Sequence, residues 1–112
     1  PLRQTYATLG IDRALAVWGA IVTVGSPVLV IDAGTALTLT GADADHQLIG
    51  GAILPGVRLQ LQALGQATAA LPGLDAATLQ SMPDRWATDT SGAIASGIVH
   101  TLLAGIQSFV QD

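Results

Sequence analysis

Asp32, Gly34 and Thr35 bring an acid, a glycine and a hydroxyl close together in the sequence. They follow a short apolar run, so we expect them at the bend of a hairpin. Glycine permits torsions with φ > 0 and a close approach of the main chain to a ligand, and free backbone N–H groups at such a bend could bind a phosphate. An ordinary Asp-x-Gly hairpin turn explains the same residues and is the preferred alternative for an isolated motif.

Asp12 and Arg13 form a second pair that could take part in chemistry, in the first turn of a predicted helix. Arg13 could bind a substrate that carries a carboxylate, while Asp12 could accept a hydrogen bond from a hydroxyl group. The alternative is structural, because an acid near the positive end of a helix dipole contributes ~0.3–1 kcal/mol and Arg13 could be a solvated surface charge. These residues alone leave both alternatives open.

The helix that positions this pair is predicted over Ile11–Val22. Its apolar side chains recur at steps of three and four residues, which is typical of an amphipathic helix. The stripe predicted to face the core consists of Ile11, Leu15, Trp18 and Val22.

Three strands are predicted to position the acid, glycine and hydroxyl motif. Val28–Ile31 is a β-branched run typical of a buried strand. Ala36–Thr40 alternates, with Leu37 and Leu39 facing a core, and Gln47–Leu54 follows the polar tip 43–46 as the third strand of an antiparallel meander. Gly50-Gly51 marks a bulge, or a place where another backbone or a ligand comes close.

Two further helices are predicted in the second half of the chain. The first runs from Val57 to Ala70, with a stripe of Val57, Leu61, Leu64 and Thr68, and Leu71-Pro72-Gly73 ends it. The second follows candidate N-caps in Thr88-Asp89-Thr90-Ser91 and repeats apolar residues every four positions, at Ile94, Ile98, Leu102, Ile106 and Val110.

Small residues on the long helix allow two interpretations. Gly92, Ser96 and Gly97 would let another helix pack closely, as in a dimer seam, or they pack inside their own domain. Trp86, in the connection Leu74–Trp86, is expected to cover core or an interface. His46 is expected to be a solvent-facing loop residue rather than a ligand, and His100 a helix-surface residue rather than a catalyst.

Composition limits the classes of function. The chain has 112 residues, half of them apolar, which is enough for one domain or part of one. It begins with Pro1, so we expect an internal fragment, and its lack of cysteine agrees with a reducing cytoplasm. A net charge of −4 with four Lys and Arg argues against nucleic-acid binding.

Two uncharged runs have lengths that could span a membrane, but their sequences argue against it. Ala14–Ile31 is interrupted by Gly25-Ser26-Pro27, and Ser91–Val110 contains Ser96, His100 and Gln107. The predicted order is helix, three-stranded meander, helix, connection, helix. This order indicates the α+β class, with helices packed on a mainly antiparallel sheet.

Four motifs in this order resemble the type III pantothenate kinases, bacterial enzymes of the actin-like, Hsp70-like, sugar-kinase superfamily. They are LGIDR at Leu9–Arg13, DAGTALT at Asp32–Thr38, GGAILPG at Gly50–Gly56 and TDTSGAIASGI at Thr88–Ile98, with LP at Leu71-Pro72 as a further match. Each motif alone is weak, but the ordered set spans nearly the whole chain.

The resemblance implies a fold and a domain division. The family fold is two ribonuclease-H-like halves that close over the nucleotide in an actin-like ATPase. Residues 1–25 would be the end of the first half, with the start of the substrate-binding helix, and 26–112 would be the second half, incomplete at its C-terminus. Half of the nucleotide cleft would then be missing, so we expect this chain alone to be inactive.

The resemblance also implies ATP-dependent phosphorylation of pantothenate to 4′-phosphopantothenate, the first step of coenzyme A biosynthesis. The cofactors would be ATP, Mg²⁺ and a monovalent cation, potassium or ammonium. Magnesium would be held largely by water and ATP oxygens. The enzyme would be a cytoplasmic homodimer that binds no nucleic acid and no membrane.

The site residues follow from the resemblance motif by motif. Asp12 matches the proposed general base, and Gly10, Ile11 and Arg13 match the pantothenate-binding segment. Asp32 matches the position that holds the monovalent cation, and Gly34 and Thr35 match the ATP-phosphate contact. The last match is Thr90, a threonine that touches pantothenate across the dimer.

This sequence also departs from the family pattern. It has no counterpart of the N-terminal aspartate-and-glycine phosphate loop, and Trp86-Ala87-Thr88 replaces a glycine and a basic residue. Two alternatives therefore stand beside pantothenate phosphorylation. One is another small-molecule kinase of the same superfamily, and the other is a non-catalytic paralogue with a regulatory or dimerisation role.

Overall fold

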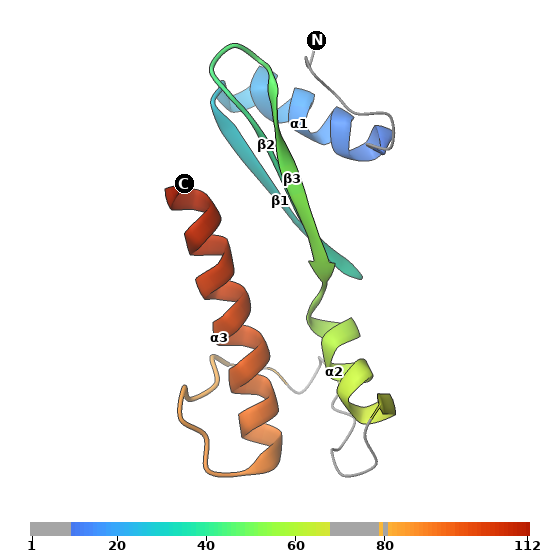
Figure 1. Cartoon of the computed structure of the whole chain (residues 1–112), viewed down its shortest axis with the longest axis vertical. Coiled ribbons are helices and arrows are strands. Elements are labelled where there is room, and N and C mark those ends of the chain that lie inside the picture. The colour runs from blue at the N-terminus through green and yellow to red at the C-terminus, as the bar shows by residue number, and fades with distance from the viewer. Residues whose placement is uncertain (1–9, 68–78, 80) are drawn as a thin grey trace. The chain divides into compact units, whose positions relative to one another are not determined.

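The computed structural model describes residues 10–67, 79 and 81–112. The chain divides into two compact units, Pro1–Leu54 and Pro55–Asp112. The first contains helix α1 and three strands, and the second contains helices α2 and α3 (Figure 1). These elements confirm the α+β class, whereas the ribonuclease-H-like, actin-like assignment and the domain division at residue 25 stay predictions.

Helix α1 spans Ile11–Val24 and confirms the predicted helix, two residues longer at its C-terminal end. It begins after Gly10, whose carbonyl accepts a hydrogen bond from the Ala14 N–H at 3.1 Å. It ends at Gly25, whose φ of 92° lies in the region that favours glycine and whose N–H donates to the Ile21 carbonyl.

The face of α1 that is buried differs from the predicted stripe. Val17 and Ile21 are buried and pack with Ala42 of the sheet, while Ile11, Leu15 and Val22 are 61–74% exposed. Trp18 alone of the predicted set packs against this core. The helix is apolar on most of its circumference, so periodicity could not decide which of two stripes faces the strands.

The sheet consists of β1 (Val28–Ala33), β2 (Ala36–Ala42) and β3 (Leu48–Pro55), in the order β1-β2-β3. All three predicted strands are confirmed. β2 lies in the centre and buries Leu37 and Leu39. The prediction that Val28–Ile31 is fully buried is wrong, because β1 is an edge strand whose first residues are half-buried and whose Ile31 is exposed.

The turn between β2 and β3 is organised by Asp43. Its carboxylate Oδ1 accepts hydrogen bonds from the backbone N–H groups of Asp45 and Gln47. His46 adopts a φ of 62°, and its ring meets Trp18 edge-on with centroids 5.8 Å apart. His46 is half-buried, so the expectation of a solvent-facing residue is wrong.

The second unit is built around the contact of α2 (Val57–Ala67) with α3 (Thr90–Gln111). Its buried residues are Leu61 of α2 and Ile94 and Ile98 of α3. Both predicted stripes are confirmed at these positions, but the prediction is wrong for Val110 at the end of the second stripe, which is 63% exposed. Thr68, the predicted end of α2 at Ala70, Leu71-Pro72-Gly73 and most of the connection before Ser81 lie outside the described residues.

The start of α3 shows what two of its small residues do. Asp89 is the N-cap, and its side chain accepts a hydrogen bond from the Gly92 N–H. A Cβ on Gly92 would lie 2.8 Å from the Asp89 Oδ1 and 3.1 Å from the Ala87 Cβ. Ser96 is buried and donates to the Arg85 carbonyl. Gly92 and Ser96 thus pack inside their own unit.

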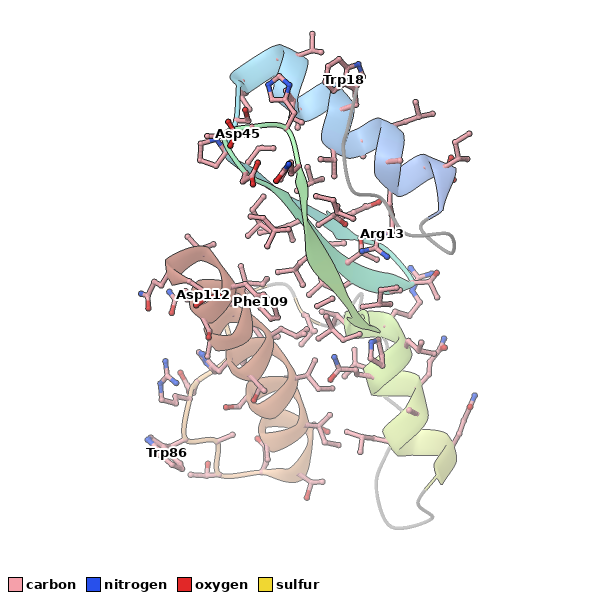
Figure 2. All side chains as sticks on the ribbon, turned by 45° about the horizontal axis from the view of Figure 1, so that its top comes forward. Arg13, Trp18, Asp45, Trp86, Phe109 and Asp112 are labelled. Atoms are coloured by element: carbon pink, nitrogen blue, oxygen red, sulfur yellow. The ribbon has the colours of Figure 1, made fainter. Side chains whose placement is uncertain are left out.

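The loop before α3 bears on the expectations for Trp86 and His100. Trp86 is 87% exposed, and in Figure 2 its side chain points away from the ribbon. The expectation that it covers core is wrong for the described residues, and the alternative that it covers an interface stays a prediction. His100 is half-buried, and its Nε2 lies 2.8 Å from the Pro83 carbonyl oxygen, so this helix residue holds the loop against α3.

Within the described residues, α3 is the one helix whose length and composition would allow it to cross a membrane. Its Ile94 and Ile98 pack against Leu61, and Ser96 and His100 hydrogen-bond to the preceding loop. These contacts give the apolar composition of the helix a role in the core of the second unit.

Candidate functional site

The register of β1 against β2 places Asp32 opposite Thr38, next to the tight turn. Side chains alternate along a strand, and directly paired residues point to the same face. One face of this hairpin therefore carries Val28, Val30, Asp32, Thr38, Thr40 and Ala42. Helix α1 covers this face, since Val17 and Ile21 pack against Val28, Val30 and Ala42. Asp32 thus lies on the side of the sheet to which α1 is bound.

Arg13 joins the start of α1 to the same face. Its Nε donates a hydrogen bond of 3.1 Å to the hydroxyl oxygen of Thr40. Arg13 is half-buried, and Thr40 is 2% exposed. In Figure 2 the Arg13 side chain lies beside the strands rather than out in solvent. The alternative of a solvated surface charge is therefore wrong for Arg13.

The glycine pair of β3 lies against this arginine. Gly50 has a φ of 143°, which L side chains rarely adopt. A Cβ on Gly51 would collide with Nη2 of Arg13 and would lie 2.6 Å from the Leu39 carbonyl oxygen. The prediction of a close approach at Gly50-Gly51 is confirmed: Gly50 supplies the torsion and Gly51 supplies the space.

The turn between β1 and β2 differs from the predicted phosphate cradle at one residue. The φ of Gly34 lies outside the left-handed region, and a Cβ there would meet only the Ala36 carbonyl oxygen, at 3.8 Å. Its N–H donates to the same oxygen at 3.0 Å. Gly34 therefore does not use the positive φ that glycine permits, and the expectation of a free N–H is wrong for this residue. Asp32 and Thr35 are exposed, so their side chains are accessible to a ligand.

The start of α1 shows where Asp12 lies, and both interpretations of this residue stay predictions. The N-cap is Gly10, which makes no side-chain capping bond, and Asp12 lies in the first turn. Asp12 is exposed, as are Gly10 and Ile11. Its structural contribution is therefore limited to the helix dipole, ~0.3–1 kcal/mol, and its carboxylate faces solvent beside the anchored Arg13.

The first unit thus contains most of the predicted site residues: Gly10, Ile11, Asp12, Arg13, Asp32, Gly34 and Thr35. Thr90 is the exposed first residue of α3 and belongs to the second unit. The sequence analysis did not identify Thr40 or assign Gly51 to Arg13. The sequence held one sign of a role for Thr40, because this polar residue lies in a predicted strand between the apolar Leu39 and Gly41, which has no side chain.

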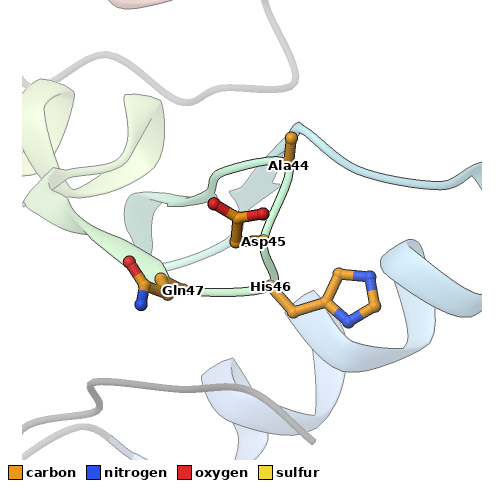
Figure 3. Close-up of a pocket in the computed structure, with 4 residues that line it drawn as sticks. All are labelled: Ala44, Asp45, His46 and Gln47. Atoms are coloured by element: carbon orange, nitrogen blue, oxygen red, sulfur yellow. The ribbon is translucent and has the colours of Figure 1, made fainter.

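Two surface pockets lie away from these residues. Figure 3 shows one at the β2–β3 turn, lined by Ala44, Asp45, His46 and Gln47, with the His46 ring directed toward α1. The other is at the end of α3, lined by Ser108, Phe109, Gln111 and Asp112. Over residues 10–67, 79 and 81–112, no three His, Cys, Asp or Glu side chains gather as a metal site.

Comparison with known proteins gives a consistent set of relatives. A family model described as Type III pantothenate kinase matches residues 2–112. A type III pantothenate kinase from Synechococcus sp. (strain JA-2-3B'a(2-13)) is 59% identical over 112 residues, which cover 100% of this chain and 44% of the relative. One from Nostoc sp. (strain PCC 7120 / SAG 25.82 / UTEX 2576) is 55% identical over 112 residues, covering 100% of this chain and 41% of the relative. The chain spans less than half the length of these relatives.

A solved structure shares the fold of the chain. It is a Campylobacter jejuni protein named for the Baf family of transcriptional activators, with a TM-score of 0.72 and 25% sequence identity. The match covers 96% of this chain and 49% of that protein. The arrangement of helices and strands therefore recurs in part of a larger structure.

The two glycines of the hairpin region give a stability prediction. We expect Gly34→Ala to leave the free energy of unfolding unchanged or to raise it by up to about 1 kcal/mol, because its φ lies outside the left-handed region and an added Cβ has room. Gly50→Ala should lower it by about 1–3 kcal/mol, because its φ is strained for any L side chain. Denaturant unfolding of the intact protein measures both. A larger loss for Gly34→Ala than for Gly50→Ala would contradict the structure of this turn.

Proposed function

The chain belongs to the type III pantothenate kinase family, and on this basis we propose that the intact protein phosphorylates pantothenate to 4′-phosphopantothenate with ATP. The product is the first intermediate of coenzyme A biosynthesis. The observation that carries the proposal is the family match over residues 2–112, together with a relative 59% identical over the whole chain. The anchored Arg13 beside an exposed Asp12 supports it independently.

In the proposed reaction, Asp12 acts on the hydroxyl of pantothenate. The hydroxyl oxygen forms a bond to the γ-phosphorus of ATP, the bond from that phosphorus to the β–γ bridging oxygen breaks, and ADP leaves. The hydroxyl proton passes to the Asp12 carboxylate. Because the transition state is loose, the proton leaves late, and alignment of the hydroxyl matters as much as basicity.

Arg13, with Gly10 and Ile11, binds pantothenate in this proposal. A guanidinium has five N–H donors in a fixed plane, and Thr40 accepts the one on Nε. Thr40 at Nε and the backbone of Gly51 beside Nη2 hold the guanidinium plane against the sheet before the substrate arrives. The exposed backbone of Gly10 and side chain of Ile11 lie at the same helix start.

The hairpin serves the nucleotide. The Thr35 hydroxyl and the exposed segment at Gly34 would contact ATP phosphates, and Asp32 would hold a potassium or ammonium ion beside them. An exposed carboxylate oxygen at the end of β1 fits such a hard cation, with ATP oxygens and water completing its shell. Magnesium would bind ATP oxygens and water, where it neutralises the developing charge.

The proposal includes a homodimer in the cytoplasm. Thr90, exposed at the start of α3, would contact pantothenate bound by the partner protomer, and the exposed Gly97 would allow close approach of a second helix. A net charge of −4 argues against nucleic acid as a partner.

A second candidate function is regulatory, because the solved relative from Campylobacter jejuni is named for transcriptional activators. A kinase of the same superfamily acting on another small molecule is a third. Phosphorylation assays of the intact protein with pantothenate, glycerol, hexoses and acetate separate these candidates. Phosphorylation of pantothenate alone supports the proposal, a preference for another acceptor supports a different kinase, and no phosphorylation of any acceptor supports the regulatory role.

Asp12→Asn tests the catalytic assignment in the intact enzyme. We expect kcat to fall by at least about a hundredfold, because the carboxylate that accepts the hydroxyl proton is lost. The free energy of unfolding should change by ~1 kcal/mol or less, since only the dipole contribution is removed. Steady-state kinetics and thermal unfolding on one preparation measure both quantities.

Asp45→Asn is the matched control, because Asp45 is an exposed acid of the same unit in the turn after β2. It should leave kcat within about twofold of the parent, as surface substitutions usually have small effects. An Asp12→Asn enzyme with unchanged kcat and a lower melting temperature would show that Asp12 acts only at the helix start.

The role of Asp32 predicts a dependence on monovalent cations. Like charges about 4 Å apart repel by ~4 kcal/mol at an effective dielectric of about 20, so an ion between Asp32 and ATP is needed. Replacing potassium by tetramethylammonium should lower kcat/KM for ATP at least about tenfold. Asp32→Asn should reduce this difference. Equal activity of the parent in both cations would count against the role.

A further inference from the structure

Thr40 is buried at a position where its hydroxyl needs a hydrogen-bond partner. It is 2% exposed, on the sheet face that α1 covers, two residues from the buried Ala42. Burying a hydroxyl without a hydrogen bond destabilises a protein. The Thr40 oxygen accepts the Nε–H of Arg13, from a residue 27 positions away in the sequence. The sheet therefore presents a buried acceptor to one particular arginine.

The atom that Thr40 contacts determines what this hydrogen bond does. Nε lies in the plane of the guanidinium, at its attachment to the side-chain stem. A hydrogen bond at Nε therefore fixes the direction of the guanidinium plane. The two Nη groups lie at the end of the side chain that is farthest from the backbone. A long flexible side chain with large rotamer freedom is held in one orientation before any ligand binds.

Gly51 of β3 is the second residue that lies against the Arg13 guanidinium. Its missing side chain is the space that Nη2 of Arg13 occupies, because a Cβ there would collide with that atom. The same Cβ would lie 2.6 Å from the Leu39 carbonyl oxygen of β2. Gly50, with its φ of 143°, gives the backbone the torsion that precedes this contact. Strands β2 and β3 thus contact the guanidinium at two of its nitrogens.

We infer that Thr40 is a positioning residue for pantothenate binding, which acts by holding the Arg13 guanidinium against the space left by Gly51. This inference rests on the proposed function, because it takes Arg13 as a pantothenate-binding residue. It assigns a role to two residues that touch the arginine and not the substrate. It also explains a polar residue at a position where valine would have the same shape.

Thr40→Val and Thr40→Ser separate positioning from simple packing. Valine keeps the shape and removes the acceptor, while serine keeps the acceptor and removes a methyl group. In the intact enzyme, Thr40→Val should raise KM for pantothenate at least about tenfold and change KM for ATP by less than about twofold. Thr40→Ser should restore KM for pantothenate to within about threefold of the parent. Thr23→Val, at an exposed threonine near the end of α1, is the control.

Gly51→Ala tests the contact between Gly51 and the Arg13 guanidinium. It should raise KM for pantothenate as Thr40→Val does, because the added Cβ displaces Nη2. Gly19→Ala is the matched control, because Gly19 lies on α1 with no atom within 4 Å of an added Cβ. The inference is overturned if Thr40→Val leaves KM for pantothenate unchanged, if it raises KM for ATP equally, or if serine fails to restore what valine removes.

A second readout requires no activity. In ¹⁵N-labelled intact protein, exchange of the Arg13 Nε–H with water should be at least about tenfold faster in Thr40→Val than in the parent and Thr40→Ser. Equal exchange in all three would overturn the positioning role. If the parent does not phosphorylate pantothenate, the proposed function fails, while the exchange experiment still decides whether Thr40 holds Arg13.

Discussion

The hydrogen bond from Arg13 Nε to the buried hydroxyl of Thr40 joins the start of helix α1 to the sheet, next to the candidate site residues. Apolar packing of Val17 and Ile21 on Ala42 fixes the helix against the sheet near its other end. The polar contact fixes the helix start. A charged hydrogen bond in a half-buried place is strong and directional, so the orientation of Arg13 depends on the sheet.

This constraint connects sequence motifs that are far apart along the chain. The LGIDR segment supplies Arg13, β2, which begins inside DAGTALT, supplies Thr40, and GGAILPG supplies the gap at Gly51. Asp32 is on the same sheet face, two residues beyond Val30, which pairs with Thr40. Residues of these motifs therefore contact one another within the chain, in addition to the ligand contacts expected of them. A substitution at Gly51 would act by displacing Arg13.

The sequence predicted the elements of the fold well and the side-chain environments less well. Turn residues and the alternation around Leu37 and Leu39 were sufficient for the meander and its neighbouring helices. The prediction of which face of α1 is buried was wrong because Val17 and Ile21 are as apolar as Leu15 and Val22. Only the position of the sheet determines which of the two pairs is buried. The partner of Arg13 could not be read from the sequence, because a contact spanning 27 positions depends on tertiary structure. At Gly34 the N–H expected to be free donates to the Ala36 carbonyl oxygen, a local hydrogen bond that the sequence did not reveal.

The central claim is that an arginine anchored by the sheet binds pantothenate, and calorimetric titration of the intact protein with pantothenate tests it most directly. Arg13→Lys keeps the charge and removes the planar fork, so the account predicts an affinity at least about tenfold weaker than that of the parent. Arg58→Lys, at an exposed arginine of α2, should bind as the parent does. Equal affinity of the Arg13→Lys protein and the parent would contradict the account.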